Sequence, residues 1–250
     1  MSCEIGFAVQ SGTGSVGFNG TQASVQVIEV SPIALLAGVS PSESREIISI
    51  ARPSSYAKGE NLFLERQAAN SLILIETGRV KLSRVGRDGG EVILRICGPG
   101  EIVDVYDESG NGRHSYSAQA MGDCRVLIWD SKQAFALGAH YPQIRINLLR
   151  ILANRLDELE ERYCEFATDN CGQRLARTLL RCVDSAGRTN YGGARVALSR
   201  RELAQMVGST VFTISRTLSK WAEHGIVSRG RNAVVVHRPS ELRTLIEHNI

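Results

Sequence analysis

The sequence predicts an α+β protein built from a small β-barrel or sandwich, a long helix and a smaller helical unit with a β-hairpin. Turn signals separate short apolar segments across residues 54–130, which is typical of small all-β barrels and sandwiches. An apolar heptad runs through residues 149–166, and two helical segments joined by a glycine follow residue 198. The expected organisation is an N-terminal arm (1–26), a strand-rich domain (27–140), a long helix (141–168) and a C-terminal domain (169–250).

The composition indicates a globular protein. The chain has 250 residues, of which 43% are hydrophobic and 22% charged, so it can bury enough apolar surface to offset the entropy of ordering. No run approaches the roughly 20 apolar residues that a membrane span needs. Because no lysine or arginine precedes Arg45, a secretory signal would lack its charged region, and we expect a cytoplasmic protein with no membrane partner.

The charges divide unevenly along the chain. Residues 1–169 carry 16 basic and 21 acidic side chains, whereas residues 170–250 carry 13 basic and five acidic ones. The formal net charge of +3 therefore combines a mildly acidic body with a basic C-terminal third. Such a separation favours two domains, the second of which faces an anionic polymer.

The cysteines are scattered, with no C-x-x-C pair. They are Cys3, Cys97, Cys124, Cys164, Cys171 and Cys182. This spacing favours neither a disulfide framework nor a tetrahedral zinc site, so we expect a reducing compartment and no metal site.

The N-terminal arm contains a potential dinucleotide fingerprint, Gly12-x-Gly14-x-x-Gly17. That fingerprint requires the third glycine to open a helix. Because Phe18-Asn19-Gly20-Thr21 follows, we reject the fingerprint and interpret residues 1–26 as a flexible arm.

The segment from residue 40 to residue 130 shows local signals for one helix followed by strands. Ser40 is a candidate N-cap for a helix over residues 41–51, with Pro41 at its first position. Strands are predicted over residues 72–75, 80–85 and 91–97, with a further strand pair between residues 115 and 129. Arg87-Asp88-Gly89-Gly90 predicts a hairpin turn, because Asp and Gly accept positive φ.

A long helix is predicted over about residues 142–167, and its apolar positions recur at alternating spacings of three and four. These positions are Leu149, Leu152, Leu156, Leu159, Tyr163 and Phe166. A strict heptad seam of this length favours a parallel partner helix, and therefore a homodimer. The alternative is an amphipathic helix that packs on its own barrel. Residues 168–172 interrupt the pattern and are expected to form the hinge between the domains.

The C-terminal third predicts a helix-turn-helix. Ser199 and Glu202 form a potential capping box for a short helix, Gly208 supplies the turn, and a second helix begins at Thr210 and runs to about residue 224. A β-hairpin wing is expected from residue 225 to residue 236, with Arg229 and Arg231 near its tip.

The outward face of the second helix predicts contact with DNA, because such a helix enters the major groove and reads base edges. Arg216 can pair bidentately with the O6 and N7 atoms of guanine, and Arg200, Ser209 and Thr210 are placed to bond phosphates. The candidate DNA-binding residues are Arg200, Ser209, Thr210, Val211, Phe212, Ser215, Arg216, Lys220, Arg229 and Arg231.

Five segments together resemble the cyclic-AMP receptor protein / fumarate–nitrate reduction regulator (Crp/Fnr) family of bacterial transcription factors. They are Lys58-Gly59-Glu60, Gly78-Arg79-Val80, Gly98-Pro99-Gly100-Glu101, Gln173-Arg174-Leu175-Ala176 and Thr213-Ile214-Ser215-Arg216. The resemblance covers about residues 28–245. It implies an N-terminal cyclic-nucleotide-binding-like β-roll (a double-stranded β-helix), a long dimerisation helix and a C-terminal winged helix-turn-helix.

The resemblance implies a homodimeric, sequence-specific transcription regulator, not an enzyme, that binds a pseudo-palindromic operator in double-stranded DNA. Control by a signal sensed in the β-roll and contact with RNA polymerase follow from the same resemblance, whether the protein activates or represses. The family's recognition helix usually reads Glu-x-x-Ser-Arg, and here Phe212 replaces the Glu that commonly accepts a hydrogen bond from cytosine. Phenylalanine cannot accept but can contact a thymine methyl group. We therefore expect an operator that keeps the guanine read by Arg216 and differs beside it.

The resemblance also implies an effector site in the β-roll. In the cyclic-AMP branch, Gly-Glu and a following Arg-Ser hold ribose and phosphate, and a Thr-Ser pair on the dimer helix meets adenine. The corresponding effector-binding candidates here are Gly100, Glu101, Arg113, His114 and Ser115. An extra residue separates Arg113 from Ser115, Leu159-Glu160 replaces the adenine-facing pair, and Asp104, Asp107 and Glu108 would repel a phosphate. Cyclic AMP is therefore disfavoured.

The effector could also be an iron–sulfur cluster or haem, as in other sensors of the family, and its identity is unknown from the sequence. An iron–sulfur cluster requires a group of thiolates, and only Cys3 lies in the N-terminal region where the family's oxygen sensors bind one, so a cluster is disfavoured. A haem sensor needs an axial ligand, for which His114 and Cys124 are candidates. The sequence is also compatible with a different small effector, or with no effector.

Two other classes of function fit the sequence less well. A regulatory module that docks only on proteins would need an apolar outward face where Ser215, Arg216 and Lys220 lie. A cupin-type enzyme needs clustered histidines and a carboxylate, whereas the predicted β-roll offers His114, with His140 just beyond it.

Overall fold

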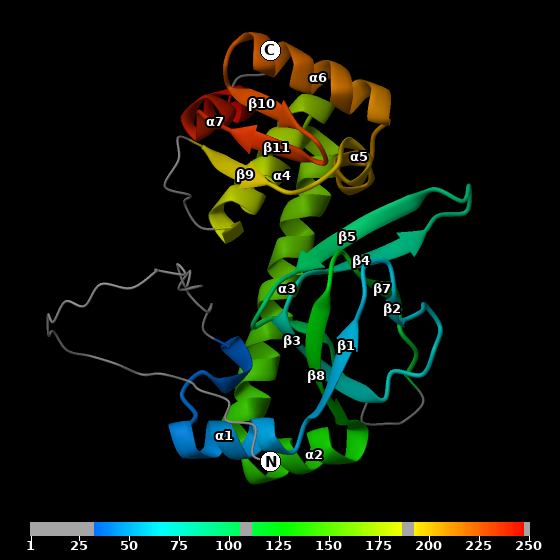
Figure 1. Cartoon of the computed structure of the whole chain (residues 1–250), viewed down its shortest axis with the longest axis vertical. Helices are drawn as coiled ribbons and strands as arrows, with labels where there is room; N and C mark the ends of the chain where they lie inside the picture. The colour runs from blue at the N-terminus through cyan, green and yellow to red at the C-terminus, as the bar shows by residue number, and fades with distance from the viewer. Residues whose placement is uncertain (1–32, 106–111, 187–192, 248–250) are drawn as a thin grey trace, which may run out of the picture.

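The computed structural model describes residues 33–105, 112–186 and 193–247, with the side chains of residues 185 and 186 excepted. The predicted arm and its glycine fingerprint lie outside the described residues. Figure 1 shows a strand-rich domain at one end of the molecule, a smaller domain at the other, and the long helix α3 (Pro142–Thr168) running between them. The predicted α+β class is confirmed.

The strand-rich domain is a β-roll of two four-stranded antiparallel sheets. One sheet has the order β1-β8-β3-β6, and the other has the order β2-β7-β4-β5. The strands are β1 (Arg52–Tyr56), β2 (Asn61–Phe63), β3 (Ser71–Thr77), β4 (Val80–Val85), β5 (Glu91–Cys97), β6 (Ile102–Asp104), β7 (Ser117–Ala120) and β8 (Cys124–Asp130). The predicted β4–β5 hairpin is confirmed, and Gly89 has a φ of +80° in its turn.

The prediction that residues 115–129 form a strand pair is wrong. Strand β7 pairs with β2 and β4, whereas β8 pairs with β1 and β3 in the other sheet. Ala118 and Ala120 from β7 nevertheless share one buried cluster with Cys124 and Val126 from β8. The two strands bury their apolar faces from opposite sides of the same core, so a shared core replaces direct hydrogen bonding between them.

Helices close one end of the roll. The 3₁₀ helix η1 (Ala34–Leu36), α1 (Pro41–Ser49), α2 (Ser131–His140) and the first turns of α3 surround a second apolar cluster. The predicted N-cap of α1 is confirmed, because the Ser40 side chain accepts from the Glu43 backbone N–H in a capping box. Trp129, fully buried, donates from Nε1 to the carbonyl oxygen of Ile47 at 2.9 Å. Ile144 and Leu148 of α3 are buried in the same cluster, so the start of α3 is packed against the roll.

The C-terminal domain is a helical unit around a small sheet. It contains α4 (Cys171–Ala186), β9 (Ala194–Val196), α5 (Arg200–Val207), α6 (Val211–Glu223), β10 (Val227–Gly230), β11 (Ala233–Val236) and α7 (Pro239–Glu247). The expected β10–β11 hairpin is present, and β9 adds a third strand to it. Six apolar side chains of α5 and α6 are buried in the core of this domain: Leu203, Ala204, Val207, Ile214, Leu218 and Trp221.

Candidate DNA-binding surface and effector site

Local hydrogen bonds set the geometry of the α5–α6 pair. The Glu202 backbone N–H donates to Ser199 Oγ at 3.2 Å, and the Ser199 N–H donates to Glu202 Oε2 at 2.7 Å. Gly208 ends α5 in the left-handed region with a φ of +65°. Thr210 then caps α6 by accepting from the Thr213 N–H at 3.1 Å. The predicted capping box and glycine turn are confirmed, and they aim the first turn of α6 away from the domain core.

The exposed face of α6 combines apolar and basic side chains. Val211 and Phe212 lie at its first turn, and Phe212 is 75% exposed. Arg216 and Lys220 are exposed further along the helix, and Ser215 is half-buried. Among the residues that the structure describes, no carboxylate lies within ion-pair distance of Arg216. The guanidinium is therefore open to an external hydrogen-bond acceptor, as a guanine contact requires.

The residues predicted to contact phosphates divide into two groups. Arg200 and Arg231 are exposed. Ser209 and Thr210 already hold the protein together, because Ser209 Oγ accepts from Cys171 Sγ at 3.2 Å and Thr210 Oγ1 caps α6. Arg229 donates to Ser219 Oγ at 3.0 Å, so it attaches the hairpin to α6.

In the β-roll, the candidate effector residue Glu101 is bonded to its own chain. Its carboxylate accepts from the Gly98 backbone N–H at 2.6 Å and from the Arg95 guanidinium at 2.7 Å. Arg95 also pairs with Glu158 on α3. Sequence reasoning missed Arg95, because its place on β5 indicated only strand alternation. The Arg95 bridge connects the turn that holds Gly100 and Glu101 to the long helix.

The other three effector candidates point in different directions. Arg113 is exposed and donates to the carbonyl oxygen of Arg66 at 2.8 Å, and Ser115 is exposed. His114 is buried, stacks on Phe63 with 3.6 Å between the ring centroids, and bonds through Nδ1 to the Asp104 carboxylate. Within the described residues, the five candidates are not joined into one hydrogen-bonded site.

A buried polar group surrounds His114 inside the roll. Tyr116 donates to Asp104 Oδ1 at 3.0 Å, and burial together with the Asp104 charge raises the pKa of the Tyr116 hydroxyl. Arg155 of α3 donates to the carbonyl oxygen of Ile102, two residues before Asp104. Tyr116 and Arg155 were also missed from the sequence, because a Tyr in a strand and an Arg beside a heptad seam are ordinary in those places.

The two haem-ligand candidates are packed into the roll. His114 has its ring between Phe63 and Asp104. Cys124 is buried, and burial raises the pKa of its thiol, which disfavours the thiolate that a metal would bind. In the described part of the chain, no group of three or more His, Cys, Asp or Glu side chains is placed to hold a metal ion.

Two family models match the chain. Residues 53–141 match the cyclic nucleotide-binding domain, and residues 173–245 match the Crp-like helix-turn-helix domain. The first covers the β-roll and α2, and the second begins in α4 and ends in α7.

Relatives and solved structures agree with both models. The chain is 27% identical over 201 residues to the CRP-like cAMP-activated global transcriptional regulator of Mycobacterium tuberculosis, covering 80% of this chain and 90% of that protein. It is 28% identical over 211 residues to the cyclic AMP receptor protein of Thermus thermophilus, covering 84% and 95%. The fold matches that of FixK2 from Bradyrhizobium japonicum with a TM-score of 0.70 at 24% identity, covering 78% of this chain and 97% of that one.

The β-roll, the long helix and the basic helix-turn-helix define a transcription regulator with separate effector-binding and DNA-binding domains. The chain belongs to the Crp/Fnr family of transcription factors, which are regulators and not enzymes. No helix within the described ranges is both long and apolar enough to cross a bilayer.

The closed core of the roll predicts a large difference in reactivity between two cysteines. Cys164 is exposed on α3, whereas Cys97 is buried and its pKa is raised to about 11 by burial and by the nearby Glu101 charge. Because the thiolate is the nucleophile, only about 0.1% of Cys97 is reactive at pH 8. Iodoacetamide should therefore modify Cys164 well before Cys97, as measured by peptide mass spectrometry after timed quenching.

The same chain in guanidinium chloride provides the control, since both thiols should then react at similar rates. Equal rates in the native protein would contradict the closed roll.

Proposed function

We propose that the protein is a homodimeric transcription regulator that reads a pseudo-palindromic operator through α6 and responds to a signal sensed in the β-roll. The observation that carries the proposal is the open guanidinium of Arg216 on the outward face of α6, within a basic helix-turn-helix domain. RNA polymerase is the expected protein partner by family membership, and we expect the protein to act in the cytoplasm because its proposed target is DNA.

The proposed reading surface has a centre and a rim. Arg216, Phe212, Val211 and Ser215 would meet base edges, because the N-terminal half of a recognition helix lies deepest in the major groove. The rim residues would contact phosphates: Arg200, Ser209, Thr210, Lys220, Arg229 and Arg231. The hydroxyl groups of Ser209 and Thr210 accept hydrogen bonds within the chain and would donate to phosphate oxygens. Phosphate contacts fix the register of the protein on the duplex without specifying sequence.

The proposed dimer rests on the apolar seam of α3. Tyr163 is 77% exposed and Leu159 is 61% exposed. All six seam residues are exposed: Leu149, Leu152, Leu156, Leu159, Tyr163 and Phe166. The side of α3 that meets the chain's own roll is a different one and carries Ile144, Leu148 and Arg155. The alternative, in which the seam packs on its own barrel, is therefore not supported, and a parallel second copy would cover the seam.

We propose that the signal is a small effector that binds in the β-roll and is not cyclic AMP. Glu101 is held by Arg95, and Leu159 and Glu160 occupy the positions where family members present an adenine-facing pair. Both of these side chains are exposed, and neither offers the two hydroxyl groups of Thr-Ser. The polar group around His114 and Arg155 would be the part of the roll that an effector rearranges.

Native mass spectrometry of the purified protein, read with its visible spectrum, tests the dimer and the effector together. We expect a mass of twice the 27.3 kDa chain at micromolar concentration, because the exposed seam would otherwise face water. A mass above that of the dimer would reveal a co-purified effector, and a visible absorption band typical of haem would identify that effector as haem. A monomer at this concentration would contradict the proposed dimer.

Replacing Arg216 with Ala should remove sequence-specific binding. One bidentate contact with guanine discriminates by about 1–3 kcal/mol, and a dimer would lose two. Affinity for an operator selected from random duplex DNA should fall towards the non-specific value, whereas the salt-dependent non-specific term should change little. Fluorescence anisotropy at several salt concentrations measures both.

Arg231→Ala is the matched control for Arg216→Ala, because it removes an exposed arginine of the same domain outside α6. It should weaken binding to all sequences equally. Specific affinity that survives Arg216→Ala would show that α6 is not the reading helix.

Phe212 should make the operator sensitive to a methyl group. We expect the selected half-site to carry thymine beside the guanine read by Arg216, because an exposed phenyl ring can contact the C5-methyl. Replacing that thymine with deoxyuridine, which lacks only the methyl group, should weaken binding by wild-type protein and leave binding by Phe212→Ala unchanged.

Phe212→Glu should move the preference at the same position towards cytosine, whose amino group Glu can accept from. Equal binding of the thymine and deoxyuridine operators by wild-type protein would refute the methyl contact without affecting the role of Arg216.

A further inference from the structure

The aromatic residue at the end of the α3 seam contacts the turn of the helix-turn-helix. A Cβ atom built on Gly208 would lie 2.7 Å from Cε1 and 3.0 Å from Cζ of Phe166. The ring therefore rests directly on the backbone of Gly208, which also needs its glycine for a φ of +65°. The sequence predicted that Phe166 belongs to the dimer seam. The structure adds a contact between Phe166 and Gly208 within the same chain.

Arg174 links Phe166 to both sides of the domain junction. Its guanidinium carbon lies 5.0 Å from the centre of the Phe166 ring, within range of a cation–π contact. Its Nε donates to the carbonyl oxygen of Val207 at the end of α5, at 3.1 Å, and its Nη1 donates to the carbonyl oxygen of Asp169 at 2.6 Å. One side chain thus joins α4, the end of α3 and the turn before α6.

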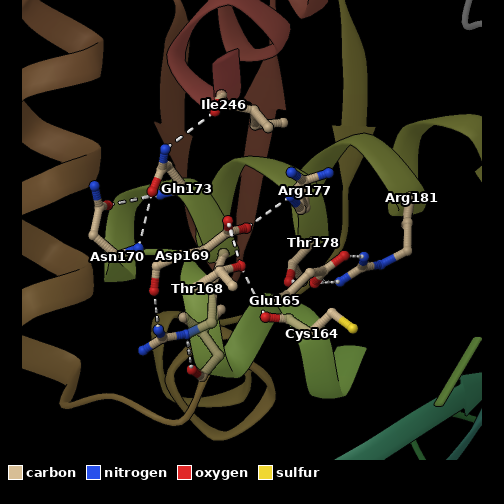
Figure 2. A network of polar contacts seen from close by, with 12 residues as sticks. Cys164, Glu165, Thr168, Asp169, Asn170, Gln173, Arg177, Thr178, Arg181 and Ile246 are labelled. Atoms are coloured by element: carbon tan, nitrogen blue, oxygen red, sulfur yellow. Dashed lines mark hydrogen bonds and ion pairs between the residues drawn. The ribbon is translucent and has the colours of Figure 1, made fainter. Parts of the chain in front are cut away.

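The junction itself is held by paired polar contacts, so the predicted hinge is braced in this structure (Figure 2). Glu165 pairs with Arg181 at 2.5 Å and 3.1 Å, and Asp169 pairs with Arg177 at 2.7 Å. Asn170 and Gln173 exchange two hydrogen bonds at the start of α4, and Gln173 also donates to the carbonyl oxygen of Ile246 at 3.1 Å. The direction of α4 is therefore tied to the end of α3.

A separate contact holds α5 from the sensor side. Gln205 donates to Glu91 on β5 at 2.9 Å, Lys81 on β4 pairs with Glu91 at 2.6 Å, and Arg79 donates to the carbonyl oxygen of Ala197 at 3.1 Å. The β4–β5 hairpin thus contacts the α5–α6 pair at Gln205 in α5, and Phe166 contacts the same pair at its turn. Removing the ring should change the orientation of the pair without detaching the domain.

We propose that Phe166 is a positioning residue that sets the direction of α6 relative to α3, and so the separation of the two reading helices in the dimer. The proposal rests on the proposed function. Phe166 is 50% exposed, which fits a ring whose edge contacts Gly208, with Arg174 over one face, and whose remaining surface would meet the second copy. A residue in both contacts transmits the geometry of the dimer seam directly to the turn that begins α6.

The test varies the spacing of the half-sites. We would prepare operators in which the selected half-sites are one or two base pairs closer together or further apart. The affinity of each operator is then measured for full-length wild-type protein, Phe166→Ala and Phe166→Leu. Wild-type protein should prefer one spacing. In Phe166→Ala that preference should fall by about fivefold to tenfold, the scale of one lost ring contact. Phe166→Leu, which fills part of the space but has no π face, should be intermediate.

Leu159→Ala is the matched control, because Leu159 belongs to the same seam but has no contact with Gly208 among those described. It should weaken dimerisation and keep the spacing preference. A preference unchanged in Phe166→Ala, with affinity reduced as in Leu159→Ala, would overturn the positioning role and leave a seam contact only.

Failure of the proposed function would be recognised differently, because wild-type protein would then show no selected operator or no dimer. The guanine preference within each half-site should persist in Phe166→Ala, which separates positioning from loss of the reading surface. Circular dichroism melting confirms that the variants are folded, and Phe166→Leu supplies the answer if the alanine variant is not.

Discussion

Helix α3 can present an apolar seam to a second copy because another side of the helix is held on the β-roll by buried polar contacts as well as apolar ones. Asn147 is 1% exposed, and its amide nitrogen donates to the carbonyl oxygens of Leu35 and Ala37, both at 2.8 Å. A buried amide without acceptors would cost about 1–3 kcal/mol. These bonds therefore fix the rotation of α3 about its own axis, and with it the side that faces outward along the whole helix.

Beyond Ile151 the attachment of α3 to the roll changes from apolar to charged. Arg155 and Arg162 donate to the carbonyl oxygens of Ile102 and Leu94, and Glu158 pairs with Arg95. Long arginine stems can cover apolar surface while their charged ends find polar partners. The helix is thereby held on the roll by apolar packing near its start and by charged groups further along, and the apolar seam is not used in either attachment.

The features that could be predicted from the sequence are those whose contacts are local. The capping boxes at Ser40 and Ser199 join residues three apart, and the alternating spacing of the seam is visible without a structure. The placement of β7 and β8 in different sheets could not be predicted, because a period-two pattern shows that a strand has a buried face but not which strand lies beside it. Glu101 was expected to face an effector, and only the fold reveals that Arg95 already holds it. The contact of Phe166 with Gly208 likewise depends on how two domains meet.

The β4–β5 hairpin touches α5 directly, so the sensor and the DNA-binding domain share a surface in addition to a helix. Thermodynamic linkage then makes the coupling reciprocal. If a ligand of the roll and operator DNA both bind more tightly when this surface is formed, each must raise the affinity for the other by the same factor. Operator DNA would in this sense be an effector of the roll, and the occupancy of the sensor would rise with the fraction of the protein that is bound to operator.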